Sequence, residues 1–248
     1  MTKTQWDYTS LADSYVQRPD YAANAIDTIV RSAHLKSGDL FCDIGAGTGI
    51  LTRALLNRNL SGVAIEPNDA MRGHGARSTP QVTWIDAVAE HTNQPDRHFN
   101  LVSFGSSLNV TDASLALAES ARILKPGGWM ACLWNHRDLT DPLQIEVEKI
   151  IHDQIPNYDY GTRRQDQTGI IDASKLFGPV LHFEGQITHT VFAESWIEAW
   201  RSHSTLERQA GAAFVNIVDQ IRRTVERRGR KTVDVPYVTR VWMAPVAT

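Results

Sequence analysis

Cysteine is scarce in this chain, and its two residues of that type stand far apart. Among 248 residues only Cys42 and Cys132 are cysteine, and both lie in apolar runs typical of strands. Cysteines in such runs are by default buried free thiols, so no disulfide is expected. No group of cysteine and histidine has the spacing of metal ligands, and no metal site is expected either.

Long hydrophobic runs and a strong net charge are also lacking. No run of about 18 apolar residues occurs, so we expect no membrane-spanning helix. The first residues, Met1–Asp7, contain no apolar segment typical of a secretory signal. With a net charge of −3, the chain is not expected to bind nucleic acid or an anionic membrane. Together these features favour a cytoplasmic protein.

Apolar residues make up 42% of the sequence, which is enough for one large α/β domain with additions. Strand patterns alternate with helical ones, as is typical of a mostly parallel sheet covered on both faces. Strands are expected at 39–44, 62–66, 82–85, 99–104, 129–134, 180–192 and 233–243. Helices are expected at 20–34, 51–60, 112–124, 141–155, 194–203 and 210–229.

Three local motifs refine this pattern. The segment Lys125–Gly128 is expected to stop the preceding helix and to reverse the chain. Pro236 is expected to weaken the first half of the last strand, because proline cannot donate a backbone hydrogen bond. Trp196 and Trp200 are four residues apart on one expected helix, a spacing typical of core packing.

The strongest functional signal is a glycine-rich stretch that runs from Phe41 to Thr52. An apolar run ends in Asp43, passes the alternating glycines Gly45, Gly47 and Gly49, and enters a helical pattern. Alternating glycines let the backbone approach a ligand closely, and a helix beginning there presents free N–H groups to the same space. The spacing G-x-G-x-G differs from the G-x-G-x-x-G of dinucleotide-binding proteins.

A second acidic residue stands at the end of the next expected strand. The apolar run Gly62–Ile65 is followed by Glu66, which completes a βαβ unit with a carboxylate at its tip. A carboxylate there can accept hydrogen bonds from both hydroxyl groups of a ribose. NAD-dependent enzymes share this feature, so Glu66 indicates a nucleoside without identifying it.

Together, the glycine spacing and Asp43 resemble the first motif of class I S-adenosylmethionine-dependent methyltransferases and favour that cofactor over NAD. From about residue 8 onward the chain resembles the small-molecule branch of this family, which includes trans-aconitate methyltransferase-like proteins. The further motifs that carry this resemblance are Tyr15–Tyr21, Glu66, Asp86-Ala87, Leu124–Gly128 and Pro236-Tyr237.

The resemblance implies a fold and a domain organisation. The expected fold is a three-layer, Rossmann-like α/β sheet of seven mostly parallel strands, with an antiparallel last strand and a helical lid. A single methyltransferase domain is expected over residues 1–248, with lid segments at approximately 1–20, 138–175 and 193–231. The oligomeric state and the substrate are not predicted.

The same resemblance implies the residues of the cofactor site. Asp43 and the glycine loop would hold the methionine portion, Glu66 the ribose, and Asp86 the adenine amino group. Ser106 would lie near the sulfonium, where many relatives carry bulky aromatic residues, and Arg18 would pair with the cofactor carboxylate. Asp86 could instead cap a turn, and Arg18 could be an exposed charge. The full set is Arg18, Asp43, Gly45, Ala46, Gly47, Glu66, Pro67, Asp86, Ala87 and Ser106.

The expected reaction is methyl transfer to oxygen or nitrogen of a small metabolite by in-line displacement. A carboxylate, an amine or an acidic phenol needs no strong base, whereas an alcohol needs one. His136, after the fifth expected strand, and His203, near a helix end in the lid, are candidate bases. Alternatively, His136 only hydrogen-bonds loop backbone and His203 is solvated. In the lid, tyrosines beside Arg163 and Arg164 suit an anionic or planar substrate.

Three other functions stay open at this point. A protein could bind the same cofactor without transferring its methyl group, because the first motif indicates binding only. An RNA methyltransferase is the second alternative, and the basic run 222–231 is the segment that could contact RNA. That run is expected instead to be the solvated end of a helix, where cations complement the dipole. An NAD-dependent oxidoreductase is the third alternative.

Overall fold

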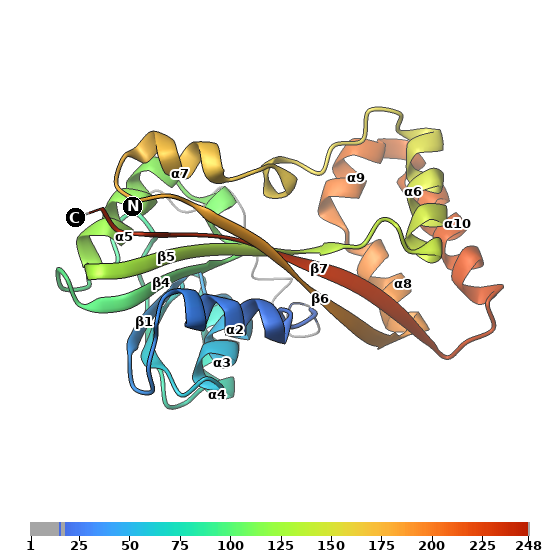
Figure 1. Cartoon of the computed structure of the whole chain (residues 1–248). Helices are drawn as coiled ribbons and strands as arrows, with labels where there is room; N and C mark the ends of the chain where they lie inside the picture. The colour runs from blue at the N-terminus through green and yellow to red at the C-terminus, as the bar shows by residue number, and fades with distance from the viewer. Residues whose placement is uncertain (1–14, 16–17, 248) are drawn as a thin grey trace. The chain divides into compact units, whose positions relative to one another are not determined.

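The computed structural model describes residue 15 and residues 18–247, and these residues form a seven-stranded sheet (Figure 1). The strand order is β3-β2-β1-β4-β5-β7-β6. In chain order the strands are β1 (Leu40–Ile44), β2 (Ser61–Ile65), β3 (Thr83–Ile85), β4 (Phe99–Gly105), β5 (Leu124–Arg137), β6 (Leu181–Phe192) and β7 (Thr232–Pro245). The predicted sheet, mostly parallel with an antiparallel end, is confirmed.

The order of the strands reverses at β1. This strand pairs in parallel with β2 on one side and with β4 on the other, while β3 and β5 extend the sheet outward. In open α/β sheets, ligands bind outside the carboxyl ends of the strands where the order reverses. The topology therefore places the glycine loop, which follows β1, at the position where a ligand is expected.

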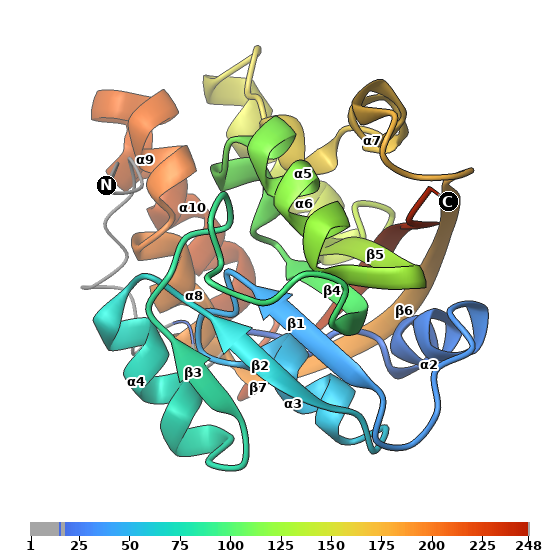
Figure 2. The ribbon, with the colours of Figure 1, turned by 90° about the vertical axis from the view of Figure 1, so that its left-hand side faces the viewer.

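Helices cover both faces of β1–β5, as Figures 1 and 2 show. Helices α2 (Ala23–Ser32), α3 (Ile50–Leu56) and α4 (Asp69–Ser78) lie on one face, and α5 (Ala113–Ile123) and α7 (Thr168–Ser174) lie on the other. The other helices are α6 (Pro142–Gln154), α8 (Ala193–Arg201), α9 (Ser204–Ala210) and α10 (Phe214–Glu226), with short 3₁₀ turns η2 (Leu108–Val110), η3 (Thr162–Arg164) and η4 (Gly211–Ala213).

Three of these helices are absent from the sequence prediction. Helix α4 contains Gly73 and Gly75, and its buried residues are only Met71 and Gly75, so it has little apolar periodicity. Its start is instead set by Asn68, whose side chain accepts a hydrogen bond from the Met71 N–H at 3.0 Å. Helices α7 and α9 have seven residues each, too few for a clear periodic pattern.

Two expectations about strands are corrected. β5 begins at Leu124, and the pairing moves from Phe99–Leu124 to Leu101–Trp129. Residues 125–128 therefore form an irregularity within β5, whereas the sequence predicted that the strand would begin after them, at residue 129. β7 continues through Pro236, because a proline loses only its donor: the Pro236 carbonyl still accepts a hydrogen bond from the Asp138 N–H at 2.9 Å.

The described chain divides into two compact units. The first contains the described residues up to Asn135, Gln165–Gln186 and the residues from Thr239 onward; the second contains His136–Arg164 and Ile187–Val238. Each has its own apolar core. In the first core Cys42 and Cys132 are buried free thiols, as predicted. The single domain with lid segments stays a prediction, and lid residues 1–14, 16 and 17 lie outside the described part.

The core of the second unit is formed by α6, α8, α10 and the start of β7. Trp196 and Trp200 are buried in it, with their ring centroids 5.8 Å apart in an edge-to-face arrangement. Their predicted packing role is confirmed. Among the helices that the structure describes, none is both long enough and apolar enough to span a membrane.

Candidate functional site

The loop between β1 and α3 uses its glycines in different ways. Gly45, Gly47 and Gly49 all have positive φ angles, of 65°, 58° and 85°, which non-glycine residues rarely adopt. A Cβ on Gly45 would lie 2.5 Å from the Ser107 Cβ, so this glycine is needed for packing. A Cβ on Gly47 would meet nothing within 4 Å, so the backbone there borders open space.

Asp43 is completely buried beneath this loop. One carboxylate oxygen accepts a hydrogen bond from the Thr52 hydroxyl at 2.6 Å, and the other accepts one from the Ser103 hydroxyl at 3.0 Å. Burial raises the pKa of Asp43 to about 6, although these two hydroxyl donors lower it. Thr52 and Ser103 are not among the predicted site residues, and Asp43 ties together β1, α3 and β4.

Glu66 connects the tip of β2 to the same loop. Its Oε2 accepts a hydrogen bond from the Gly47 N–H at 2.8 Å, and its Oε1 accepts one from the Asn68 N–H at 2.8 Å. Burial raises the pKa of Glu66, and these backbone donors oppose that effect. Each carboxylate oxygen can accept a further hydrogen bond, so Glu66 keeps the capacity to hold a hydroxyl-bearing ligand.

Asp86 follows β3 and is 68% exposed at its side chain. Its carboxylate lies 3.6 Å from Arg72 of α4, and Arg72 also donates to the Glu66 carbonyl at 2.7 Å and pairs with Asp69. Arg72 thus joins the tips of β2 and β3. The sequence reasoning missed Arg72 because it missed α4, although Asn68 is a recognisable helix cap.

Ser106 and Ser107 follow β4 at the same edge of the sheet. Ser106 has a positive φ angle of 60°, and its hydroxyl lies 3.1 Å from the Tyr21 hydroxyl. The Ser107 hydroxyl donates to the Ile44 carbonyl at 2.6 Å, which fixes β4 to the end of β1. Burial raises the pKa of Tyr21, so its phenol stays neutral and can donate a hydrogen bond.

The remaining predicted cofactor residues lie near these strand ends. Ala87 is buried in the first core, and Ala46 donates its N–H to the Ile65 carbonyl at 3.0 Å. Pro67 directly follows Glu66. Arg18 is exposed, with its guanidinium 3.6 Å from the centroid of the Tyr15 ring, and Val16 and Gln17 of the same motif lie outside the described residues. Pairing of Arg18 with a cofactor stays a prediction.

Both candidate bases lie in the second unit. His136 lies inside β5, which extends to Arg137, and not after the strand as expected; it is buried. His203 caps α9: its Nδ1 accepts a hydrogen bond from the Leu206 N–H at 3.1 Å, and its ring stacks on Trp200. The neutral His203 ring therefore carries its proton on Nε2.

Arginines and aromatic rings form a connected network in the second unit. Arg137 donates to Gln144 at 2.7 Å and to Glu148 at 2.9 Å, and its guanidinium lies 4.5 Å from the centroid of the Trp200 ring. Tyr160 also donates to Glu148. The Arg164 guanidinium lies 4.2 Å from the centroid of the Tyr160 ring.

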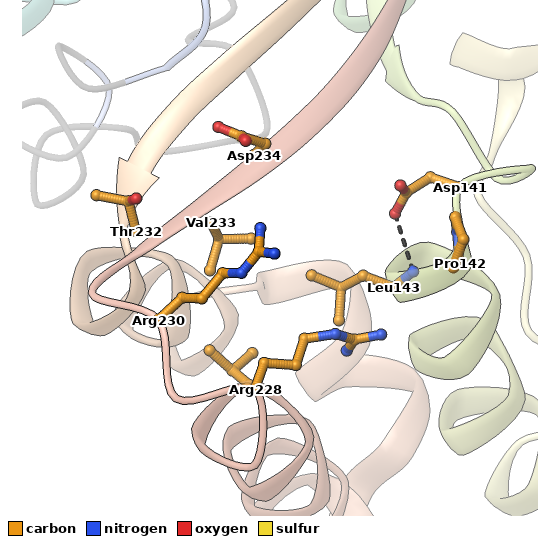
Figure 3. A pocket seen from close by; sticks show the side chains of 9 residues that line it. Asp141, Pro142, Leu143, Arg228, Arg230, Thr232, Val233 and Asp234 are labelled. Carbon is orange, nitrogen blue, oxygen red and sulfur yellow. Dashed lines mark hydrogen bonds between the residues drawn. The ribbon is translucent and has the colours of Figure 1, made fainter.

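A pocket of about 500 Å³ lies elsewhere in the second unit (Figure 3). None of the predicted site residues lines it. Arg228 pairs with Glu146 at 2.9 Å, and Asp141 caps α6 through the N–H groups of Leu143 and Gln144. The lining residues are Asp141, Pro142, Leu143, Val225, Arg228, Arg230, Thr232, Val233 and Asp234.

The basic run 222–231 ends α10, and its residues beyond the helix are exposed. Arg222 pairs with Asp219 and Glu226 on the same helix. This is the arrangement expected of a solvated helix end. Within residue 15 and residues 18–247, no group of three or more histidine, cysteine or acidic side chains could hold a metal ion.

Comparisons with known sequences agree with this geometry. Residues 42–132 match a family described as a methyltransferase domain. An uncharacterized methyltransferase of Mycobacterium tuberculosis is 34% identical over 121 residues, which are 49% of this chain and 48% of that protein. A ubiquinone/menaquinone biosynthesis C-methyltransferase of a Caulobacter species is 30% identical over 147 residues, which are 53% of this chain and 58% of that protein. The match thus spans about half the length of these curated relatives.

Solved structures resemble a larger part of the chain. A protein of Anaeromyxobacter dehalogenans described as a type II methyltransferase is 18% identical, has a TM-score of 0.67, and covers 92% of this chain and 97% of its own. Phosphoethanolamine N-methyltransferase 2 of Haemonchus contortus, solved with S-adenosylhomocysteine, is 15% identical and has a TM-score of 0.54. The likeness covers 96% of this chain and 57% of that one. At these identities the likeness shows the fold.

The family match falls on the strands that build the site, because residues 42–132 include β1 from Cys42, the glycine loop, Glu66, Asp86 and β4. The full sheet has the strand order given above, and the methyltransferase structures just named share its fold. The domain match, the relatives and the fold together support a class I S-adenosylmethionine-dependent methyltransferase.

Proposed function

We propose that this protein transfers the activated methyl group of S-adenosylmethionine to an oxygen or nitrogen atom of a small metabolite. The observation that carries the proposal is the joint geometry of Gly47 and Glu66. The Gly47 backbone borders open space at the carboxyl edge of the sheet, and the Gly47 N–H holds the Glu66 carboxylate at 2.8 Å. A backbone cradle and a fixed carboxylate are the features that a nucleoside requires.

The residues present fit the cofactor in charge as well as in shape. Asp43 and Glu66 are both acidic and both lie beside the glycine loop, and the cofactor carries a positive sulfonium and an ammonium group. Asp86, exposed at the end of β3, adds a hydrogen-bond acceptor at the same edge. This set supports the assignment of methionine, ribose and adenine contacts to Asp43, Glu66 and Asp86, respectively.

When bound, S-adenosylmethionine supplies a methyl group on a positively charged sulfur, which is an excellent leaving group. The protein has to orient sulfur, methyl carbon and acceptor on one line and to exclude water. Such positioning can lower a barrier by about 7–11 kcal/mol. Ser107 and Glu66 contribute here by fixing the two ends of the glycine loop, through the Ile44 carbonyl and the Gly47 N–H.

The class of acceptor is proposed from the second unit. Arg137, Glu148 and Tyr160 form a partly buried network in which arginines face aromatic rings. Such surroundings favour an anionic or planar acceptor, and they are compatible with the trans-aconitate methyltransferase-like branch. For an alcohol acceptor we propose His136 as the base. Unchanged turnover of His136→Gln with intact cofactor binding would remove that role.

A second candidate is methyl transfer to carbon. It is favoured by one specific observation: several of the curated relatives are named as C-methyltransferases of ubiquinone and menaquinone biosynthesis. A planar acceptor would suit either case. The two candidates differ in the atom that carries the new methyl group in the product.

The test is a calorimetric titration with S-adenosylhomocysteine, followed by a screen with labelled S-adenosylmethionine across carboxylic acids, phenols, amines, sugars and quinols. Saturable binding and a labelled product support the proposal, and the position of the label decides between oxygen, nitrogen and carbon. Binding without transfer to any class favours a protein that only binds the cofactor. Binding to RNA that weakens steeply with salt would favour an RNA methyltransferase.

A further inference from the structure

Three elements meet at one buried carboxylate beneath the cofactor loop. Asp43 lies in β1, one residue before its end, Thr52 lies in the first turn of α3, and Ser103 lies in the middle of β4. All three side chains are buried, with exposed fractions of 0%, 0% and 1%. Their two hydrogen bonds, of 2.6 Å and 3.0 Å, use both carboxylate oxygens. We call these residues the Asp43 cluster.

The two donors in the Asp43 cluster are neutral hydroxyl groups. A buried carboxylate is strongly destabilised unless donors or a cation compensate for the lost water. Hydroxyl donors compensate only in part, and the pKa of Asp43 accordingly lies at about 6, above its usual range, because burial outweighs them. The charge on Asp43 is therefore sensitive to each of the two hydroxyl groups.

Other titratable groups face the cluster from neighbouring elements. Glu66 faces it from the end of β2 and raises the pKa of Asp43 further by repulsion. Tyr21, before α2, and Cys42, the preceding residue of β1, both interact with Asp43, but burial raises the pKa of each, so both stay neutral. Within this set, Glu66 is the group that shares the site with Asp43 as a second negative charge.

We propose that Ser103 and Thr52 are positioning residues that keep Asp43 ionised for the cofactor, and that cofactor binding releases a proton from Asp43. The inference rests on the proposed function, since it needs a cationic ligand at the loop. Both cationic groups of S-adenosylmethionine, and the ammonium of S-adenosylhomocysteine, favour the ionised carboxylate. Neither Ser103 nor Thr52 has to contact the ligand, because both act through Asp43.

The linkage gives a defined dependence on pH. A ligand that binds only the ionised form loses up to about tenfold in affinity per pH unit below the pKa of that group. A hydrogen bond to a charged group stabilises it by about 1.5–3 kcal/mol, and one pKa unit corresponds to about 1.4 kcal/mol. Loss of one hydroxyl donor should therefore move the midpoint upward by about one pH unit.

The experiment is a calorimetric titration with S-adenosylhomocysteine between about pH 5.5 and 8 on the wild type, Ser103→Ala and Ser103→Thr. Wild-type affinity should fall below about pH 6, and Ser103→Ala should bind about three- to eightfold more weakly than wild type at pH 6.5 to 5.5 but less than about twofold more weakly at pH 8. Ser103→Thr keeps a hydroxyl and should restore the wild-type profile.

A matched control is Ser120→Ala on α5. The Ser120 side chain is also fully buried, and its hydroxyl donates to the Ala116 carbonyl at 2.7 Å, away from the loop. It should lower the free energy of unfolding without moving the pH midpoint of binding. If Ser103→Thr does not fit the strand, the pair Thr52→Val and Thr52→Ser makes the same comparison from α3.

Proton release is read directly by repeating the titration near pH 6 in buffers of different ionisation enthalpy. About half of the free protein carries this proton near pH 6, so the inference predicts release of about half a proton per ligand bound by the wild type. It is overturned if wild-type affinity is independent of pH, or if Ser103→Ala weakens binding by the same factor at every pH, as a purely structural residue would. Complete absence of S-adenosylhomocysteine binding by the folded wild type contradicts the proposed function instead.

Discussion

The most informative single residues are glycines and acids whose side-chain environments differ although their sequence motifs look alike. Gly45 and Gly47 both have positive φ angles, but only Gly45 is packed against another residue. Asp43 and Glu66 are both buried acids, but hydroxyl groups hold the first and backbone N–H groups the second. These differences lead to two predictions.

The two glycines should respond differently to alanine. Gly45→Ala places a Cβ 2.5 Å from the Ser107 Cβ and should lower the free energy of unfolding by about 3 kcal/mol. Gly47→Ala has open space and should cost only about 1 kcal/mol, for its positive φ angle, while weakening S-adenosylhomocysteine binding at least about tenfold. Urea denaturation and calorimetry measure the two effects. Equal losses of stability would show that the loop is packed in the same way at both positions.

Asp43 should also make unfolding depend on pH. Its pKa is raised by burial from 3.8 to about 6 in the folded protein, so the folded state holds this proton more tightly than the unfolded state. The stabilisation is fully present below pH 4 and is lost as the pH rises through about 6, by about 3 kcal/mol. Urea denaturation at several pH values should show this slope in the wild type, and Asp43→Asn should lack it. Parallel curves for the two proteins would contradict the assigned environment of Asp43.

Helix α4 has a weak sequence pattern, but it contributes an important residue to the candidate site. It carries Arg72, which donates to the Glu66 carbonyl and approaches Asp86, so it fixes the ends of β2 and β3 relative to each other. Its own apolar contacts are few. We therefore expect the N-terminal cap at Asn68 to hold Arg72 in position at the site, in addition to stabilising α4.

Removal of that cap tests this role. Asn68→Ala should lower the free energy of unfolding by about 1 kcal/mol and weaken S-adenosylhomocysteine binding by about three- to tenfold, because Arg72 loses its fixed position. Asp112→Ala is the control, since Asp112 caps α5 in the same way through the Leu115 N–H at 3.1 Å. It should cost similar stability but leave binding unchanged. Equal ligand affinity in the two variants would contradict a role of α4 in the ligand site.

Most of the strands and the glycine loop could be predicted because apolar runs and glycine spacing are local signals. Hence Asp43 and Glu66 were placed at adjacent strand ends, where the structure has them. Thr52 and Ser103 could not be found in this way, since their roles arise from contacts of a hydroxyl with a residue 9 or 60 positions away. Arg72 was not predicted because its helix, α4, has only weak apolar periodicity.

At the level of the chain, the described residues form two compact units with separate cores. The proposed cofactor contacts lie in the first unit, and the network around Arg137 lies in the second. Arg137 and Glu148 are 12% and 13% exposed at their side chains, so their ion pair is largely buried. The two units should therefore respond separately to substitution.

Arg137→Met should act on the second unit. Loss of the arginine removes the ion-pair partner of Glu148, which keeps its hydrogen bond from Tyr160, and should destabilise this unit by about 1–3 kcal/mol. Hydrogen exchange should increase in α6 and α10, with protection of β1 and β4 retained. Affinity for S-adenosylhomocysteine should stay within about twofold of wild type, while turnover falls. Loss of cofactor binding in this variant would show that the two units do not act separately.

The most direct test of the central claim is calorimetric titration of the wild type, Glu66→Gln and Gly47→Ala with S-adenosylhomocysteine at pH 8. Saturable binding by the wild type that is at least about tenfold weaker in both variants, with folding retained, is the predicted result. A wild type that is folded but does not bind, or variants that bind as well as wild type, would contradict a nucleoside held between the glycine loop and Glu66.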